Sequence, residues 1–343
     1  MQIAFLQWLA EEKHEEKVPI SDMPTVILIH AVNPHGMAEY RRPNEENVDL
    51  NRNSMPEHEL ESLVSSHANH EYYRKFDGFF NQRRRASHFD AYWRLWIEAI
   101  YMIIQQGQPA LKAAMVGGQY YQSRGIFYGG DSVQASPKLL ESWLKAWLKA
   151  ASQNNPSETE DQKAKKPVIT WIDLHTGLGP NGVDTIIINP SSVLHPDRDQ
   201  RKELEEWFPG APSGLNAQEK SDNDVTQGYQ HTKGFLVDYF EKYVFDDVEY
   251  ETLTLCQEFG TVPSVLVGHS LMIENAAFFS DNLSDEEKRE WAKRTTLRAF
   301  YPQSRHWRKK VLERGLALML QACERSSTWR EKNSLKNQRE FSM

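Results

Sequence analysis

Three short blocks of the sequence hold residue types that can do chemistry together. Residues 171–177 read WIDLHTG, residues 255–261 read LCQEFGT, and the loop at 41–53 carries two adjacent arginines and an Asn-Arg pair. A histidine can hold a metal ion, a glutamate can take a proton from water, and a guanidinium group can bind a carboxylate. The three blocks therefore predict one polar site for an anionic ligand if the fold brings them together.

His175 lies where an apolar, strand-like run opens into a turn that contains Gly177. Such a position holds an imidazole rigidly at the C-terminal edge of a sheet, which suits a metal ligand. Asp173 precedes it by two residues, so a strand places both side chains on one face, where Asp173 can orient the imidazole. The alternative is a histidine whose hydrogen bonds serve the structure only.

Glu258 ends a second strand-like run, shortly before Gly260. A carboxylate at that position loses part of its hydration, which raises its pKa and suits a general base that acts on water. Glutamates also end strands without any catalytic role, and this alternative stays open.

The loop at 41–53 supplies positive charge and amide groups. Arg52, beside Asn51, presents a guanidinium fork that can bind a carboxylate through two hydrogen bonds. Arg41 and Arg42 lie upstream in the same loop and can converge on the same anionic ligand or on an oxyanion. Surface ion pairs are the alternative explanation for these arginines.

In combination the blocks resemble the zinc carboxypeptidase clan (carboxypeptidase A-like metallopeptidases), in particular an uncharacterised branch with HAxNPxG, NVDLNRN, WIDxHTGLG and EFGT blocks. The resemblance extends from Met1 to about Ala322, without residues 152–166 and much of 191–230. It implies a zinc-dependent hydrolase of C-terminal peptide or acyl-amide bonds that acts next to a free carboxylate.

The resemblance also implies roles for individual residues. By position, His175 matches a zinc ligand and Glu258 matches the catalytic base. Asn51 and Arg52 match the pair that binds the substrate carboxylate.

Two further assignments have alternatives. Either Arg41 or Arg42 matches the arginine that stabilises the oxyanion, and their spacing does not decide between them. Tyr229 is a candidate for the substrate pocket, although aromatic residues in loops more often serve packing.

One block of the family is not in this sequence. Members of the branch carry a His-Gly-x-Glu-Gly block just before the helix that here begins at Met1, and this block supplies two of the three protein ligands of zinc. The chain thus resembles an N-terminally truncated member that holds zinc weakly and is inactive, because a catalytic zinc needs three protein ligands. His30 and His35 are the nearby substitutes. The alternative functions are a non-catalytic carboxylate-binding protein and a scaffold.

Apolar runs and turn signals predict an α/β fold. Short β-branched or apolar runs predict strands at 25–32, 167–174, 183–189 and 249–257. Periodic segments predict helices at about 88–105, 136–151, 232–244, 263–279, 284–297 and 304–325. The alternation implies one α/β domain with a largely buried sheet. The resemblance implies that this domain covers residues 1–325 and is a zinc-peptidase-like, three-layer α/β/α arrangement whose mixed, mostly buried sheet lacks its first strands.

The remaining segments are predicted from composition. Residues 152–166 form a polar, disordered insertion, residues 191–230 a long irregular excursion, and residues 326–343 a polar tail. The first seventeen residues form an amphipathic helix, and its apolar side chains cover so much of its circumference that an interior position is expected.

Charge and cysteine content narrow the classes of function. The net charge of -8 argues against a nucleic-acid surface. Two cysteines cannot form a disulfide framework, and no apolar run is long enough for a membrane span. We expect a cytoplasmic protein with a small-molecule or peptide carboxylate as its substrate and with no nucleic-acid or membrane partner. The sequence leaves the oligomeric state open.

Overall fold

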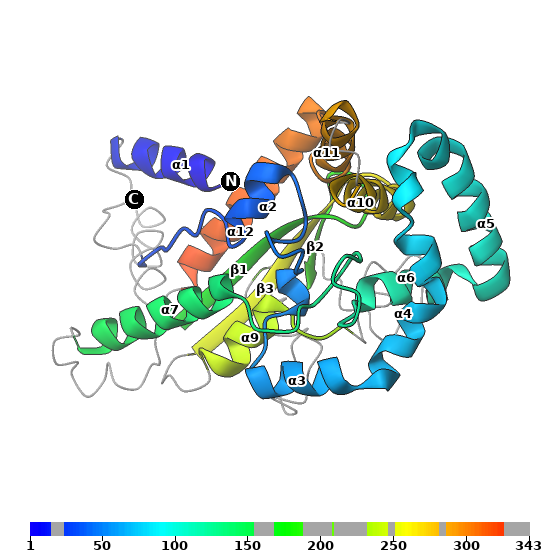
Figure 1. The fold of residues 1–343 in the computed structure, drawn as a ribbon. Coiled ribbons are helices and arrows are strands. Elements are labelled where there is room, and N and C mark those ends of the chain that lie inside the picture. The colour runs from blue at the N-terminus through cyan, green and yellow to red at the C-terminus, as the bar shows by residue number, and fades with distance from the viewer. Residues whose placement is uncertain are drawn as a thin grey trace.

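The computed structural model describes residues 1–14, 24–153, 168–187, 208, 232–245, 251–280 and 286–325. These residues form a helix-rich α/β fold around a small mixed sheet (Figure 1). The predicted α/β class is confirmed.

The sheet has three strands in the part of the chain that the structure describes. They are β1 (Val168–Gly177), β2 (Asp184–Ile187) and β3 (Glu251–Gly260), in the order β1-β3-β2. β1 runs parallel to β3 and β2 runs antiparallel to it, so the sheet is mixed as predicted. All three lie where the sequence predicts strands, with ends that differ by a few residues.

Helices cover both faces of the sheet. On one face, α7 (Ala135–Gln153) and α9 (Leu236–Tyr243) pack on the odd-numbered residues of β1, and the ring of Trp171 stacks on Phe240 at 4.5 Å. On the other face, α12 (Arg305–Glu324) packs its Leu318 against apolar side chains of β3. The sheet therefore lies between two helical layers (Figure 1).

A helical region lies beside the sheet (Figure 1). It comprises α3 (Glu57–Ser65), α4 (His67–Phe80), η3 (Arg83–Ala86), a π-turn (Asp90–Arg94), α5 (Leu95–Gln106), α6 (Gln108–Gly117), α10 (Ser264–Phe278) and α11 (Glu286–Phe300). Aromatic residues of α4 pack with α5, α6 and α10 in one hydrophobic core. The sequence predicts α5, α10 and α11 but gives no prediction for α3, α4 and α6.

The strand predicted at 25–32 is wrong. Residues 24–31 have no regular secondary structure, and Val26 is 38% exposed. Two apolar side chains of the predicted strand, Ile27 and Val32, pack against the core beneath α7 and α9. The side chain of Gln2 donates a hydrogen bond to the backbone carbonyl of Ile29. An apolar run becomes a strand only where a neighbouring strand pairs with its backbone, and no described strand does so here.

The first helix, α1 (Gln2–His14), is present, but its predicted interior position is wrong. Phe5 is buried, and Met1 contacts the core around Trp307 of α12. Ile3 is 72% exposed, so α1 buries one face only.

The loop at 33–53 contains two short helical turns that the sequence did not predict. They are α2 (Pro34–Glu39) and η2 (Leu50–Arg52). The Asn33 side chain caps α2 by accepting a hydrogen bond from the Gly36 amide. Asp49 caps η2 in the same way.

Several predictions concern residues that the structure does not describe. Residues 154–166, residues 191–230 apart from Phe208, and residues 326–343 lie outside the described residues, and so does Tyr229. None of the described helices has the length and apolar character that a membrane crossing requires.

Candidate metal and anion site

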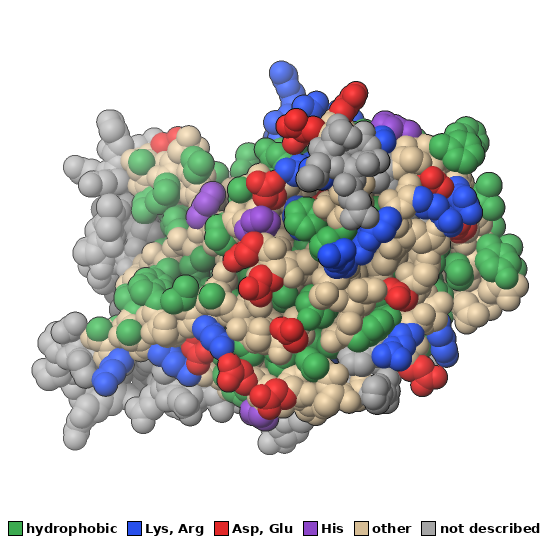
Figure 2. Space-filling view, in the orientation of Figure 1, with side chains coloured by type: hydrophobic (Ala, Val, Ile, Leu, Met, Phe, Trp, Pro, Cys, Tyr) green, Lys and Arg blue, Asp and Glu red, His purple; other side chains and the backbone are tan. Residues whose placement is uncertain are grey.

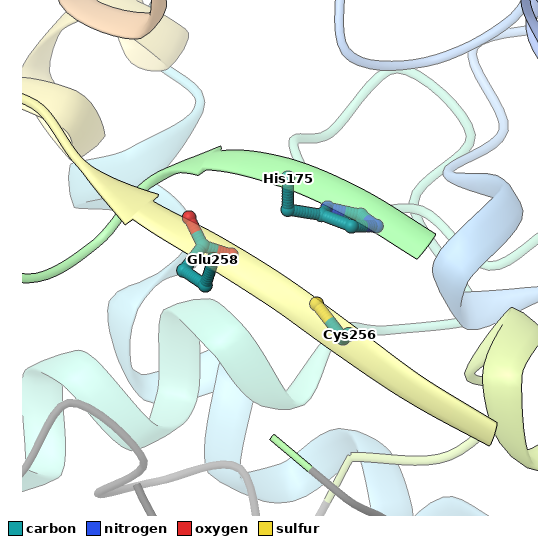
Figure 3. A group of neighbouring side chains, drawn as sticks. All are labelled: His175, Cys256 and Glu258. Atoms are coloured by element: carbon teal, nitrogen blue, oxygen red, sulfur yellow. The ribbon is translucent and has the colours of Figure 1, made fainter. Parts of the chain in front are cut away.

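Parallel pairing of β1 and β3 brings two predicted site residues together. His175 is the register partner of Glu258, and Asp173 is the partner of Cys256. Because side chains alternate along a strand, these four residues share one face of the sheet. Figure 3 shows His175, Cys256 and Glu258 side by side on the two strands.

Three of these side chains form a cluster that could hold a metal ion. One ligand atom each from His175, Cys256 and Glu258 lies within 4.8 Å of the others, and no other such group of His, Cys, Asp and Glu occurs among the described residues. His30 and His35, the substitutes considered from the sequence, are not part of it. Cys256 is not among the site residues predicted from the sequence, although its position two residues before Glu258 already places both on one face.

The imidazole of His175 is held by a carboxylate. Its Nε2 lies 2.8 Å from Oδ2 of Asp173 and 3.4 Å from Nδ2 of Asn51. Oδ1 of Asn51 accepts a hydrogen bond from the Leu236 amide, which fixes the orientation of the Asn51 side chain. Nε2 therefore faces both the amide nitrogen of Asn51 and the carboxylate of Asp173. Its shorter contact is with the carboxylate, which can only accept, so Nε2 serves best as the donor in that pair. The remaining ring nitrogen, Nδ1, is then the one suited to a metal ion.

The charges around His175 shift its pKa. Burial lowers the pKa, but the charge and hydrogen bond of Asp173, together with the charge of Glu258, outweigh it and raise the pKa to about 9. The imidazole is therefore protonated at neutral pH in the metal-free protein.

Glu258 and Cys256 lie in surroundings that disfavour negative charge. Burial raises the pKa of Glu258, against the opposing effects of His175 and of the hydrogen bond that the Leu178 amide donates to Oε1 at 3.0 Å. Burial also raises the pKa of the Cys256 thiol, and the charges of Glu258 and Asp173 add to this. The raised pKa of Glu258 agrees with the prediction from its position at a strand end.

Arg42 brings positive charge to the same site. Its Nε donates to Oδ2 of the buried Asp49 at 2.8 Å, its guanidinium lies over the Phe127 ring, and its side chain stays 24% exposed. Its charge lowers the pKa of both His175 and Glu258.

Arg41 lies in a different environment. Its side chain is fully buried, its Nε donates to Oε1 of Glu274 on α10 at 2.6 Å, and its Nη2 donates to Asn47. The guanidinium carbon lies 3.3 Å from the centre of the Phe278 ring. Of the two adjacent arginines, Arg42 is the one whose charge acts on His175 and Glu258.

Arg52 is also fully buried. Its Nε and Nη2 donate to the carbonyl of Val116, and its Nη1 donates to the carbonyl of Asn51 at 2.7 Å. Its guanidinium carbon lies 5.4 Å from the ring centres of both Phe127 and Phe235. Because Arg52 is fully buried, a substrate carboxylate could take the predicted two hydrogen bonds from it only after the side chain became accessible.

Comparison with known proteins gives a family. The sequence model described as "Protein of unknown function (DUF2817)" matches residues 2–314, and the chain therefore belongs to that family. No curated protein and no solved structure matches the chain.

Proposed function

We propose that this member of the DUF2817 family is a metal-dependent hydrolase that cleaves an amide bond next to a free carboxylate. One observation carries the proposal: ligand atoms of His175, Cys256 and Glu258 lie within 4.8 Å of one another at the ends of two paired strands. The resemblance to zinc carboxypeptidases supports the reaction class.

The donor types present fit a zinc ion, and His175 and Cys256 would supply two of the three protein ligands that a catalytic zinc has. Nitrogen and sulfur are the donors that zinc prefers, and Nδ1 of His175 with Sγ of Cys256 would supply one of each. Bonds of zinc to such atoms are about 2.0–2.3 Å long, so the three ligand atoms, which lie within 4.8 Å of one another, would move closer together to share one ion. Asp173 would hold the imidazole in the required orientation, as carboxylates commonly do for metal-binding histidines. A bound zinc ion would polarise the substrate carbonyl and make water easier to deprotonate.

Glu258 is the proposed general base. Its raised pKa brings its proton affinity closer to that needed at neutral pH, and the Leu178 amide fixes one of its oxygens. Glu258 takes a proton from water as the water oxygen bonds to the carbonyl carbon. It then returns the proton to the amide nitrogen as the carbon–nitrogen bond breaks, so the products are a carboxylic acid and an amine.

Arg42 is the proposed cation for the substrate. It is partly exposed and its charge acts at the site, so it can stabilise negative charge on the carbonyl oxygen or bind the substrate carboxylate. Arg52 holds the backbone of Asn51, whose amide contacts His175, and we infer that these two residues position the site.

The test is hydrolysis by the purified chain with added zinc. Peptides and N-acyl amino acids with a free carboxylate should be cleaved, and the same compounds with an amidated C-terminus should react far more slowly. His175→Ala should abolish the activity. Zinc-loaded chain that cleaves none of these compounds, or cleaves amidated ones equally well, would refute the proposal.

A second function is favoured if Glu258 binds the ion as well. The same cluster would then offer three protein ligands and an open position but no base, which suits a non-catalytic protein that binds carboxylates through its metal and Arg42. Zinc bound with high affinity and protection by small carboxylates against thermal unfolding, without turnover, would support this alternative.

A further inference from the structure

One helix exposes a continuous apolar face. Five large side chains at its surface are each more than half exposed: Trp93 67%, Ile97 68%, Ile100 58%, Tyr101 58% and Ile104 74%. They begin at the π-turn and continue along α5. Their spacing of three and four residues places them in one stripe along the helix, which we call the α5 stripe. Figure 2 shows hydrophobic side chains gathered at the end of the molecule where α5 lies in Figure 1.

The opposite face of α5 is already used. Leu95 and Ala99 are buried in the core with aromatic residues of α4, and Met102 packs against the same core. α5 is therefore apolar on both faces, and a helix that is apolar all round is normally enclosed by protein. An exposed apolar patch of this kind marks an interaction surface.

The charges around the stripe favour a protein partner over a membrane. The stripe itself has no charged residue, and the neighbouring Arg94 and Arg84 bond to Glu98 at 3.2 Å and 2.7 Å. A helix that binds a lipid surface normally carries an excess of Lys and Arg beside its apolar face. α5 itself carries no Lys or Arg, Arg94 and Arg84 are paired with Glu98, and the chain has a net charge of -8, so an anionic membrane would repel this face.

We propose that the α5 stripe is the interface of a two-fold symmetric homodimer. An uncharged face is self-complementary, since two copies can meet without placing like charges opposite each other. In an antiparallel pair of α5 helices, Ile97 would face the partner's Ile100, and Trp93 would face the partner's Ile104. Five such side chains expose roughly 500–700 Å² per copy, close to the ~800 Å² per partner of a stable interface.

Oligomeric mass in solution tests this directly. Light scattering after gel filtration should give twice the chain mass of 39.8 kDa, and dilution should shift the equilibrium toward the monomer. Ile97→Glu should give a monomer with an unchanged circular dichroism spectrum, because it would bury a charge in the interface. The matched control is Leu139→Glu on α7, since Leu139 is also 68% exposed, and it should remain dimeric.

A mixing experiment tests the antiparallel arrangement. Ile97→Glu and Ile100→Lys should each be monomeric, but together they should form a dimer, because the glutamate of one chain would face the lysine of the other. A native chain that is monomeric at concentrations on the order of 100 µM would overturn the proposal. So would equal dissociation by Leu139→Glu, or binding of the native monomer to anionic vesicles through α5. None of these outcomes depends on hydrolysis.

Discussion

His175 and Glu258 are register partners on two parallel strands, so the backbone of the sheet fixes the distance between an imidazole and a carboxylate. Neither strand end can shift without breaking the ladder of hydrogen bonds. The same pairing places Asp173 beside Cys256, which gives the site two carboxylates, an imidazole and a thiol on one face. The site thus depends on the sheet for its geometry, and the loop at 41–53 adds the positive charge.

Cys256 should contribute to metal binding. Cys256→Ser should weaken the affinity for zinc by at least tenfold, because the hydroxyl of serine is a poor ligand beside a thiolate. Cobalt bound to the native chain should show the near-ultraviolet absorption of a thiolate–metal bond, and the variant should lack it. Cys323→Ser, which changes the other cysteine, should leave both properties unchanged. A cobalt spectrum without the thiolate band would remove Cys256 from the ligand set.

Even with Cys256, we expect zinc to be held weakly, because His175 and Cys256 are two protein ligands where a tight site has three. Extensive dialysis should leave far less than one zinc per chain, measured by atomic absorption. One zinc per chain after dialysis would instead show that Glu258 is a third ligand.

Glu258→Gln separates the two roles of this carboxylate. If Glu258 is the base, the amide keeps the shape of the side chain but cannot take a proton, so turnover should fall by roughly 10²- to 10⁴-fold. The affinity for zinc, measured by competition with a chelator, should change only slightly. A variant that loses zinc together with activity would identify Glu258 as a ligand.

The stability of the metal-free chain should depend on His175 at alkaline pH. The pKa of His175 is raised from 6.5 to about 9 on folding, so the folded protein holds this proton more tightly than the unfolded chain. The stabilisation is fully present below pH 6.5 and is lost as the pH rises through about 9. It amounts to roughly 3 kcal/mol. Urea unfolding of the native chain and of His175→Gln should therefore differ most at the acidic end and converge near pH 10, about one unit above the folded pKa.

Zinc binding should show the opposite dependence on pH. The ion can bind His175 only after the proton leaves, so the affinity for zinc should rise about tenfold per pH unit between about pH 7 and pH 9. The thiol of Cys256, whose pKa is raised by burial, should make the slope steeper. An affinity that does not change over this range would show that neither residue binds the ion.

The sequence predicts the part of the site that depends on strand ends. The apolar runs before His175 and Glu258 locate β1 and β3 correctly. The alternation of side chains along β1 places Asp173 on the same face as His175. What the sequence cannot supply is the pairing between strands. The order β1-β3-β2 brings Cys256 to His175, and among the described strands residues 25–32 find no partner despite their strand-like composition.

The sequence also does not predict which of the arginines are buried. Arg41, Arg42 and Arg52 look alike in a polar loop, but the fold buries the first and third and leaves the second partly exposed. Their partners are contributed by distant segments, such as Glu274 of α10 and the carbonyl of Val116. Local composition carries no signal for such contacts.

Substitution of the two adjacent arginines should affect stability and activity to different extents. Arg41→Met leaves Glu274 buried without its partner, so the free energy of unfolding should fall by about 3–5 kcal/mol. Arg42→Met breaks a partly exposed ion pair with Asp49 and should cost only about 1–2 kcal/mol of stability. If Arg42 binds the substrate, its variant should nevertheless lose most of the hydrolysis measured with zinc. Urea unfolding and activity on the same preparations test both expectations.

The double variant Arg41→Met with Glu274→Gln should recover part of the lost stability, because it removes the uncompensated charge. Equal loss of stability in the two single variants, or full activity of Arg42→Met, would contradict the division of roles between these residues.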